Sequence, residues 1–507
     1  MLARIEELLQ SVEPCRCGQH RAITMDAIVV ERGALGQTAS YLQDRGHRHV
    51  ALVADANTLR AAGEALHARL EEAGIETTVI VLKPDDRGDI VADEQSLVQL
   101  LLEVRHEATS ALLAVGAGTI HDLVRFAAYK MGKPFVSVPT APSVDGFTSI
   151  GAPLIIRGIK TTVPAIAPEA IFADLDVLMA APQPMIAAGF GDMLGKYTSL
   201  FDWKFGHLTA GEPYCEAAAD ITRRALDACV NAAGDIGARS EEGVRVLTNA
   251  LIESGLAMLL FGQSHPASGS EHHLSHYWEM EYIRLGRKQL LHGAKVGVAC
   301  GVIAEFIRSV ESGGTLQQHW GEIVSQLPRV PSPDTIRDLL RQVGGPTSPE
   351  ALGIEEELLR RSLREAHLVR NRATLLKAYN ELGAPASAPH GAIPILRMFD
   401  EEKTKEFYIG FLGFRLDWEH RFEPGTPLYM QLSDGLGAML HVSEHHGDAT
   451  PGSAVRLEVR HIERMQAELL GRAYKYARPG LQTTSWGTKE MCIQDPAGNK
   501  IIFYERI

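Results

Sequence analysis

The sequence has 507 residues, which is enough for two to four domains with large hydrophobic cores. Apolar residues make up 45% and charged residues 22%, as in ordinary soluble globular proteins. The net charge is −13, which argues against nucleic acid and anionic membranes as partners of the whole surface, although a pocket for a small anion can still be basic.

The features that report on location favour a reducing cytoplasm. The six cysteines are few and scattered, which is not typical of a disulfide framework. Residues 1–9 predict an acidic amphipathic helix without the hydrophobic core of a signal peptide. No run approaches the roughly 20 apolar residues of a membrane span. We therefore expect a soluble, cytoplasmic protein, and we also expect a homodimer or a larger homo-oligomer.

Near the start of the chain, Cys15, Cys17 and His20 form the pattern Cys-x-Cys-Gly-x-His. Thiolates and imidazoles are common metal ligands, so these residues could be half of a metal clip. The sequence shows no second half. We therefore interpret the segment as a small turn that carries thiols.

From about residue 25 the sequence alternates between short apolar runs and amphipathic helical patterns. Strands are predicted at 49–55, 77–82, 111–115 and 134–139, and helices at 58–72, 97–104 and 122–131. The run 111–115 is apolar throughout, which is typical of a strand buried in a parallel sheet. The alternation predicts βαβ units and a doubly wound, Rossmann-like α/β domain over residues 1–180.

Gly116 and Gly118 lie in a turn between the buried strand and the next helix. Glycines let the backbone approach a pyrophosphate, and free N–H groups at a helix start attract anionic oxygens. The full Gly-x-Gly-x-x-Gly fingerprint is absent, so a simple tight turn is the alternative. Asp55 ends another strand, where it could bond a ribose hydroxyl or cap the following helix. Residues 140–149 form a hydroxyl-rich turn after a strand end, where open α/β sheets bind ligands.

After about residue 181 the strand signals fade, and helical patterns such as 245–260 and 290–310 predict a helical domain over 181–383. His272 and His276 are four residues apart, so on a helix they lie on one face. Asp192, His272 and His292 offer one carboxylate and two imidazoles, which suit a catalytic divalent metal. We expect these side chains to face the nucleotide domain. A surface or core histidine pair without metal is the alternative.

The last part of the chain differs in composition and in the order of its predicted elements. Residues 384–390 are rich in alanine and proline and predict a linker. Beyond it, strands are predicted at 393–398, 428–432, 437–442, 455–459 and 501–504, and helices at 401–412 and 462–470. The order βαβββ occurs twice. Residues 391–507 are therefore predicted to be an α+β domain of paired modules.

Several long motifs agree in order and spacing with one known family. They are residues 116–122, 137–149, 189–196, 268–272 and 292–293. Through them, residues 10–380 resemble the sn-glycerol-1-phosphate dehydrogenases of the dehydroquinate synthase-like and iron-type alcohol dehydrogenase group, especially the bacterial branch. The resemblance implies a metal-dependent, reversible reduction of dihydroxyacetone phosphate to sn-glycerol 1-phosphate with NADH or NADPH.

The resemblance also implies the residues of the site. Asp192, His272 and His292 would bind zinc or nickel, and a donor set of this kind is compatible with either ion. Asp192 would also contact the substrate, as would Asp145 and His276, with proton transfer near His276. The residues that would hold NAD or NADP are Gly116, Gly118, Thr119, Thr140, Ser143 and Ser149, with Asp55 beside them. For the substrate phosphate the sequence offers Arg157, Lys160 and Lys196, each of which could instead be structural or solvated.

Residues 391–507 resemble the vicinal oxygen chelate superfamily, closest to its bleomycin-resistance-like members. The motifs that carry this resemblance are residues 407–408, 412–414 and 495–500. Ile393, Ala454 and Ile502 stand where metal-using members place ligands, so the resemblance implies no catalytic metal in this domain. His441, His445 and His446 could form another cluster, or could lie in a solvated loop.

Three further functions stay open at this point. The same scaffold could serve a glycerol dehydrogenase or another polyol oxidoreductase, which a comparison of phosphorylated with free dihydroxyacetone decides. The C-terminal domain could make the protein a ligand-sequestering, antibiotic-binding one. Alternatively, that domain could only promote dimerisation.

Overall fold

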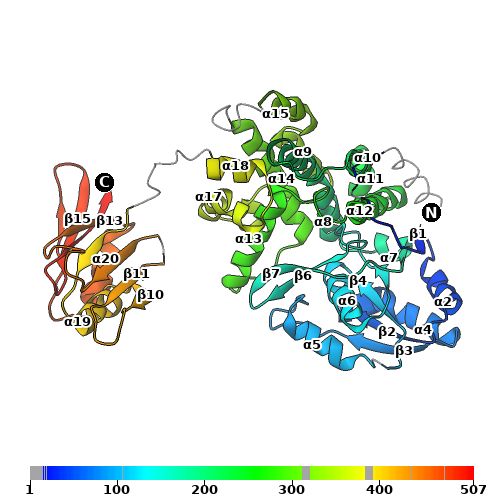
Figure 1. Ribbon diagram of the computed structural model, residues 1–507, viewed down its shortest axis with the longest axis horizontal. Helices are drawn as coiled ribbons and strands as arrows, with labels where there is room; N and C mark the ends of the chain where they lie inside the picture. The colour runs from blue at the N-terminus through cyan, green and yellow to red at the C-terminus, as the bar shows by residue number, and fades with distance from the viewer. Residues whose placement is uncertain are drawn as a thin grey trace. The chain divides into compact units, whose positions relative to one another are not determined.

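The computed structural model describes residues 15, 17–18, 20–105, 107–310, 320–382, 392–435, 437–472 and 474–506. The chain divides into two compact units, Met1–Ala386 and Ser387–Ile507, and each has its own hydrophobic core. The first unit contains a sheet and a helical part, and the second is rich in strands (Figure 1). The predicted helix at 1–9 and the predicted linker at 384–390 lie outside the described residues.

A six-stranded parallel sheet begins the first unit, which confirms the Rossmann-like prediction (Figure 1). Its strand order is β1-β8-β5-β4-β2-β3. Strands β2, β4, β5 and β8 are buried along their whole length, which explains their continuous apolar sequences. The strands are β1 (Ala27–Glu31), β2 (His49–Ala54), β3 (Glu76–Val81), β4 (Ala111–Gly116), β5 (Phe135–Pro139) and β8 (Ala170–Asp174).

Helices cover both faces of this sheet. In β2, Leu52 packs in one core cluster with residues of α2 and α4, while its neighbour Val53 packs in another with residues of α5 and α6. This division follows from the alternation of side chains along a strand. An antiparallel hairpin, β6 (Gly151–Ile156) and β7 (Ile159–Pro164), follows β5. The helices are α2 (Leu35–Asp44), α3 (Ala56–Thr58), the π-helical η1 (Leu59–Gly63), α4 (Glu64–Glu72), α5 (Glu94–Glu103) and α6 (Gly118–Met131).

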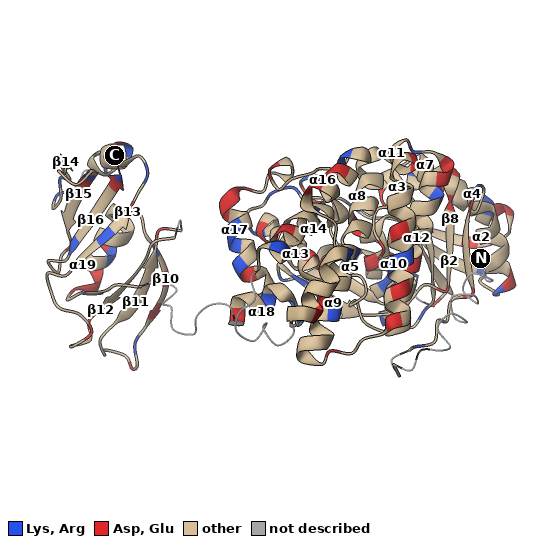
Figure 2. Cartoon of the chain, turned by 90° about the horizontal axis from the view of Figure 1, so that it is seen from above, with Lys and Arg blue, Asp and Glu red and all other residues tan. Residues whose placement is uncertain are grey.

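The rest of the first unit is helical, as predicted, but its first helix begins at Leu175, six residues before the predicted boundary at 181. Acidic and basic residues are interspersed on its helices, for example on α17, where Arg360 pairs with Glu357 (Figure 2). The elements are α7 (Leu175–Met179), α8 (Gln183–Leu194), α9 (Lys196–Ala210), α10 (Glu216–Asn231), α11 (Ala233–Gly237), α12 (Glu241–Phe261), α13 (Ser270–Arg284), α14 (His292–Ser309), α15 (Trp320–Gln326), η3 (Leu327–Arg329), α16 (Pro333–Gln342), η4 (Glu350–Leu352), α17 (Glu356–Glu365), η5 (Ala366–Val369) and α18 (Leu375–Leu382).

Helix α12 corrects one expectation from the sequence. Its 21 residues are long and apolar enough to meet the length and composition of a membrane span, whereas no such run was expected. However, 72% of its most apolar window is buried inside the protein. It begins with a Ser240 cap, whose side chain accepts from the Gly243 N–H, and it ends at Gly262 in the left-handed conformation. These features are those of a core helix.

Helices α8 and α14 cross at backbone distance, and glycines make this possible. A methyl group on Gly293 would lie 1.9 Å from the carbonyl oxygen of Ala188, and one on Gly191 would lie 2.4 Å from the carbonyl oxygen of Gly293. Side chains at these positions would therefore force the two helices apart. The crossing brings Asp192, on α8, close to His292, the first residue of α14.

The second unit confirms the prediction of two βαβββ modules. One four-stranded sheet has the order β10-β11-β12-β9, and the other has the order β13-β16-β15-β14. The first module contains β9 (Ile395–Arg397), α19 (Glu401–Lys405), the π-helical η6 (Glu406–Phe411), β10 (Arg415–His420), β11 (Tyr429–Ser433) and β12 (Met439–Ser443). The second contains β13 (Ala454–Glu458), α20 (Ile462–Gly471), β14 (Leu481–Thr483), β15 (Thr488–Gln494) and β16 (Lys500–Arg506).

A buried polar contact ties the two modules together. Tyr408 donates its hydroxyl to Asp495 over 2.8 Å. The other oxygen of Asp495 accepts the backbone N–H groups of Ala497 and Asn499, which closes the turn before β16. The Asn499 amide donates to the carbonyl oxygen of Arg397 in the first module. The motif residues Tyr408 and Asp495 to Asn499 therefore hold the unit together from within.

Candidate active site

A cavity of about 670 Å³ lies at the carboxyl edge of the parallel sheet. Asp55 follows β2, Gly118 follows β4 and Ser143 follows β5, and all three line the cavity. The adjacent order β5-β4-β2 puts these strand ends side by side, since the carboxyl ends of parallel strands meet at one edge. The helical part contributes His272 and His292 to the same wall.

Three side chains in this cavity form a possible metal site, here called the cavity cluster: Asp192, His272 and His292. Each offers a ligand atom, and these atoms all lie within 4.8 Å of one another. Nε2 of His272 is 3.7 Å from Oδ1 of Asp192, and the two imidazole rings have their centres 5.2 Å apart. The three residues predicted to bind metal are therefore brought together from three helices.

Glu271 fixes the orientation of the His272 ring. Nδ1 of His272 donates to Oε1 of Glu271 over 2.7 Å. Glu271 also accepts from the Gly269 N–H and from the Thr198 hydroxyl, both over 2.7 Å, so its carboxylate is firmly held. With Nδ1 engaged, Nε2 faces Asp192 with a free lone pair, which is the arrangement of histidines that ligate metals. The sequence analysis did not single out Glu271, although it adjoins the ligand.

The chemistry of the cavity cluster fits a divalent cation. Nδ1 of His292 is buried and has no hydrogen-bond partner among the described residues. Burial lowers the pKa of both ligand imidazoles well below 6.5, so they are neutral, as ligation requires. Burial raises the pKa of Asp192 to about 6, and the nearby Asp145 adds to this rise. A cation at this position would offset the cost of burying that carboxylate.

Lys196 lies between the two aspartates of the site. Its ammonium is 2.7 Å from Oδ2 of Asp145 and 3.1 Å from Oδ1 of Asp192. Asp145 also accepts from the Ser254 hydroxyl, and its backbone N–H donates to Oδ2 of Asp192 over 2.9 Å. Lys196 is fully buried, so it is occupied within the protein and is not a free cation for a substrate phosphate.

His276 lies one helical turn beyond His272, as the spacing predicts. Its ring centre is 6.2 Å from that of His272 and 5.8 Å from that of His292. Burial lowers its pKa well below 6.5, so the ring is neutral near pH 7. Both His276 and Asp145 line the cavity. Their contact with substrate stays a prediction.

The residues predicted to hold the dinucleotide divide into two groups. Gly118, Thr119, Ser143 and Ser149 line the cavity, and helix α6 begins at Gly118 without a side chain capping its first N–H groups. These N–H groups can bind an anion. Gly116 lies at the end of β4, where its carbonyl accepts from the Thr140 N–H over 3.0 Å. Gly116 and Thr140 thus shape the turn, and Ile120 packs where a Gly116 side chain would lie.

Asp55 caps the helical segment that follows β2. Its Oδ1 accepts the backbone N–H groups of Asn57 and Thr58 over 2.7 and 2.9 Å, and the Thr58 hydroxyl accepts the Asp55 N–H. The capping alternative considered from the sequence is thus confirmed. Within the described part of the chain, Oδ2 of Asp55 accepts no hydrogen bond, so a ribose contact stays a prediction.

Arg125, a residue that the sequence analysis did not single out, fixes the hydroxyl-rich turn. It is fully buried, pairs with Asp122 at 2.9 Å, and donates to the carbonyl oxygens of Gly146, Phe147 and Gly151. Gly146 and Phe147 belong to the turn that carries Ser143 and Ser149, and Gly151 is the first residue of β6 after it. The cavity wall after β5 is therefore held by one guanidinium.

The cation best placed for an anionic substrate is also one that the sequence analysis missed. Arg370 lines the cavity and donates to the hydroxyls of Ser268, over 3.2 Å, and Thr162, over 3.1 Å. No carboxylate of the described residues lies within ion-pair distance of it. Burial lowers its pKa to about 10, which leaves it charged at pH 7. Arg370 thus offers an uncompensated charge to the cavity.

The cations that the sequence did offer are placed less favourably. Lys160 lines the cavity but pairs with Glu279 at 2.7 Å, and Glu279 also pairs with Lys295 at 2.7 Å. Arg157 lies exposed in the turn between β6 and β7. The charge of Lys160 is therefore partly compensated by the Glu279 carboxylate, so Lys160 attracts an anionic substrate less strongly than Arg370 does.

Comparison with known proteins identifies relatives of both units. A family model described as iron-containing alcohol dehydrogenase matches residues 29–182, and one described as glyoxalase superfamily protein matches residues 388–507. A glycerol-1-phosphate dehydrogenase (NAD(P)+) from Geobacillus stearothermophilus is 49% identical over 397 residues, which cover 75% of this chain and 98% of the relative. The chain belongs to the glycerol-1-phosphate dehydrogenase family.

Other members of the glycerol-1-phosphate dehydrogenase family match at greater distance. The protein of that name from Bacillus subtilis is 44% identical, covering 71% of this chain and 92% of its own length. That from Methanosarcina acetivorans is 32% identical, covering 69% and 89%. These two matches leave 29% and 31% of this chain uncovered, and the glyoxalase-like region, residues 388–507, is 120 of its 507 residues.

Solved structures confirm the fold of the first unit. Glycerol dehydrogenase from Schizosaccharomyces pombe superposes with a TM-score of 0.54 at 20% identity, covering 72% of this chain and 91% of that one. Maleylacetate reductase from a Rhizobium species gives 0.53 at 17% identity, covering 69% and 91%. The parallel sheet followed by a helical part is thus a shared architecture.

In the second unit the histidines considered from the sequence have separate surroundings. Nδ1 of His441 is 2.7 Å from the Tyr429 hydroxyl, and Nε2 is 3.0 Å from the side-chain oxygen of Gln431. The His445 ring instead packs edge-on against Phe422. Both ring nitrogens of His441 are thus used within the protein, and the absence of a catalytic metal in this unit stays a prediction.

Proposed function

We propose that this protein catalyses the reversible NAD(P)-linked interconversion of dihydroxyacetone phosphate and sn-glycerol 1-phosphate. The observation that carries the proposal is the convergence, in one cavity, of a carboxylate with two neutral imidazoles and a glycine turn at the carboxyl edge of a parallel sheet. The relatives at 44–49% identity bear the name of this activity, which supports it.

We assign one divalent cation, zinc or nickel, to the cavity cluster. Asp192, His272 and His292 would hold it, and Glu271 would keep the His272 ring in its ligating tautomer. When bound, such an ion acts as a Lewis acid toward the substrate carbonyl. Three protein ligands leave coordination positions open for substrate, as in other catalytic sites.

The dinucleotide is assigned to the sheet side of the cavity. The N–H groups of Gly118 and Thr119 at the start of α6 would bind the pyrophosphate, and Ser143 and Ser149 would bind the nicotinamide half. Oδ2 of Asp55 would accept from a ribose hydroxyl, which favours NAD without excluding NADP. The bound nicotinamide supplies or accepts the hydride.

His276 and Asp145 are assigned to the reacting end of the substrate. The neutral ring of His276 carries one N–H and one lone pair, so it can donate a hydrogen bond to a substrate oxygen and relay a proton to water. Asp145 is already bonded to Lys196 and Ser254, so we assign it the orientation of the substrate rather than proton transfer.

Arg370 is assigned to the substrate phosphate. Guanidinium groups bind phosphate through two parallel N–H donors, and Arg370 has no carboxylate partner among the described residues. Its neighbours Ser268 and Thr162 donate through hydroxyls that can turn toward a phosphate oxygen. This assignment distinguishes a phosphorylated substrate from a free polyol.

The experiment that tests the proposal is a comparison of dihydroxyacetone phosphate with free dihydroxyacetone, using NADH and NADPH and the purified full chain. We expect the phosphorylated ketone to have the higher kcat/KM. Arg370→Gln should raise its KM by about 10- to 100-fold while leaving the free ketone unaffected. Arg360→Gln, on the exposed face of α17, is the control. A preference for free dihydroxyacetone would instead establish a polyol dehydrogenase.

For the second unit we propose the binding of a small aromatic or cationic ligand. Trp418, which is 43% exposed, stacks on Tyr429 at 5.9 Å on the β10-β11-β12-β9 sheet. Exposed stacked rings suit aromatic and cationic ligands. Titration of the full chain with a bleomycin-type antibiotic, followed by tryptophan fluorescence, should show saturable quenching that Trp418→Leu removes.

We also propose that the protein is cytoplasmic and forms a homodimer or a larger homo-oligomer. Sedimentation of the full chain and of a chain truncated near residue 385 tests the oligomeric state.

A further inference from the structure

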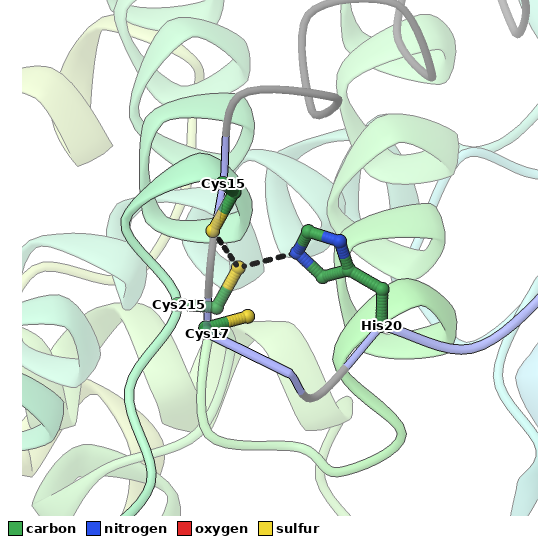
Figure 3. A group of neighbouring side chains, drawn as sticks. All are labelled: Cys15, Cys17, His20 and Cys215. Carbon is green, nitrogen blue, oxygen red and sulfur yellow. Dashed lines mark hydrogen bonds between the residues drawn. The ribbon is translucent and has the colours of Figure 1, made fainter.

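A second group of metal-ligand side chains lies apart from the cavity. Figure 3 shows Cys15, Cys17 and His20, from the segment before β1, turned toward Cys215, the residue that caps α10. We call these four residues the cysteine cluster. Their ligand atoms all lie within 4.8 Å of one another. The sequence offered only the first three residues, and the fold supplies the fourth from 195 residues beyond His20.

The distance between two sulfurs of the cysteine cluster matches a tetrahedral metal site, and the imidazole lies within hydrogen-bond distance of one of them. The sulfurs of Cys15 and Cys215 are 3.8 Å apart, and Nε2 of His20 is 3.1 Å from the Cys215 sulfur. Zinc–sulfur bonds of about 2.3 Å at the tetrahedral angle put two sulfurs about 3.8 Å apart. By contrast, a disulfide needs about 2.05 Å between its sulfurs. The spacing is that of two ligands around one ion.

We propose that the cysteine cluster binds one zinc ion as a structural site. Three sulfurs and one imidazole are a donor set that zinc uses in closed, four-coordinate sites, whereas oxygen-seeking ions avoid it. None of the four residues lines the cavity described above. With four protein ligands no position is left for substrate, so this ion would not take part in the proposed reaction, and the inference does not depend on it.

The role of such an ion follows from what the cluster joins. The Arg21 N–H donates to the carbonyl oxygen of Leu260, near the end of α12, over 2.8 Å. Cys15 and Cys17 pack against a core cluster that contains Trp203, Leu260 and Phe261. The ion would therefore fasten the segment before β1 to the helical part, and closing so long a loop restricts the unfolded chain.

Burial raises the pKa of the Cys215 thiol, while a backbone contact at the helix start favours the ionised sulfur. The Ala218 N–H donates to the Cys215 sulfur over 3.3 Å, in the first turn of the 16-residue helix α10. Positive charge at a helix start stabilises an anionic sulfur. Nε2 of His20 faces this sulfur and would turn its lone pair to the ion. Cys215 is buried, while the other three ligands are partly exposed, so an ion can enter from that side.

Cobalt substitution of the full chain tests the proposal. Cobalt bound by thiolates absorbs in the near ultraviolet through sulfur-to-metal charge transfer, whereas the cavity cluster has only nitrogen and oxygen donors. We expect wild-type protein to bind two ions per chain and to show this band. His272→Ala should keep the band with one ion per chain. The triple variant Cys15→Ser, Cys17→Ser, Cys215→Ser should lose the band, keep one ion and retain turnover, whereas Cys17→Ser alone should only weaken the band because two thiolates remain.

The outcomes that overturn the proposal are equally specific. The wild-type spectrum does not depend on any variant, so the absence of a thiolate band in it is decisive even if the triple variant fails to fold. A band that persists at full intensity in the triple variant would place the cobalt elsewhere. A Cys15–Cys215 disulfide, found by mass spectrometry in protein kept under argon, would assign these sulfurs to a covalent bond instead.

Discussion

The cavity cluster and the cysteine cluster bring metal ligands together in opposite ways. The cavity cluster has three nitrogen and oxygen donors on helices α8, α13 and α14, and it faces a space of about 670 Å³. The cysteine cluster has four donors, three of them sulfur, and none borders that space. An incomplete set beside a cavity leaves room for chemistry, whereas a complete set leaves none. Access and donor number therefore distinguish the site proposed for catalysis from the one proposed to stabilise the fold.

The largest expected effect is loss of turnover when the cavity cluster is broken. His272→Ala removes an imidazole ligand, and polarisation by a metal is worth several kcal/mol, so kcat/KM should fall by at least about 10³-fold. Because His272 lines the cavity, we expect circular dichroism and the melting temperature to stay close to wild type. Full activity in this variant would remove Asp192, His272 and His292 from the mechanism.

A second prediction tests the glycine crossing that positions the cavity cluster. Gly293→Ala places a methyl group 1.9 Å from the Ala188 carbonyl, and overpacking of this kind costs about 1–3 kcal/mol or more. We expect a lower melting temperature and weaker metal binding. Gly301→Ala is the matched control on the same helix, because its methyl group would meet nothing closer than 3.8 Å. Equal behaviour of the two variants would contradict the geometric explanation.

A third, smaller effect is expected at Glu271, which orients His272. Glu271→Gln keeps the size of the side chain but weakens the hydrogen bond to Nδ1, and changes of this kind lower metal affinity by about 10- to 100-fold. Competition with a chelator, read out by turnover, measures this change. The cobalt–thiolate band of the cysteine cluster should not move. A shift in that band would mean that the two clusters are coupled.

The smallest effect concerns the far end of α13, beyond both clusters. Hydrogen bonds from Arg284 and an ion pair with Arg361 lower the pKa of Glu281 to about 2 from 4.5. As the pH falls below 4.5, Glu281 is protonated in the unfolded chain before it is protonated in the folded one. The stabilisation that the ionised Glu281 gives to the fold is therefore complete above pH 4.5 and is lost as the pH falls toward 2.

Glu281→Gln tests this acid sensitivity by calorimetry. At pH 6 the variant should be less stable, because it lacks the ion pairs of Glu281. The loss should be only about 1 kcal/mol, because solvent screens ion pairs near the surface. The difference from wild type should shrink between pH 4.5 and 3. Glu357→Gln, on the exposed face of α17, should change nothing. A difference that grows on acidification would reverse the sign of the linkage.

The sequence predicted all three residues of the cavity cluster because they lie in local motifs. The four-residue spacing places His272 and His276 on one face, and glycines surround Asp192 and follow His292. Cys215 and Arg370 could not be found in this way. Neither belongs to a motif, and only the folded chain brings them beside residues 195 and 102 positions away.

The fold shows the same division between local and long-range information. The central strands β2, β4 and β5 were predicted because they are buried on both faces and are therefore apolar throughout. Strand β1, with alternating burial, and the hairpin β6–β7 carried no such signal. Helix α6 begins at Gly118, four residues before the prediction, since no side chain marks its first turn. The formation of β1 and of the hairpin β6–β7 depends on pairing with other strands, which the local sequence does not reveal.

The ammonium of Lys196 has a consequence for how the enzyme matures. It pairs with two carboxylates in the core of the first unit before any cation arrives and compensates one of their two negative charges, so the polypeptide can reach its final shape first and bind the ion afterwards. Small zinc domains behave differently, because they fold only around their ion. The reactive ion should then be exchangeable within an intact scaffold, and the supply in the cell would decide which element is used.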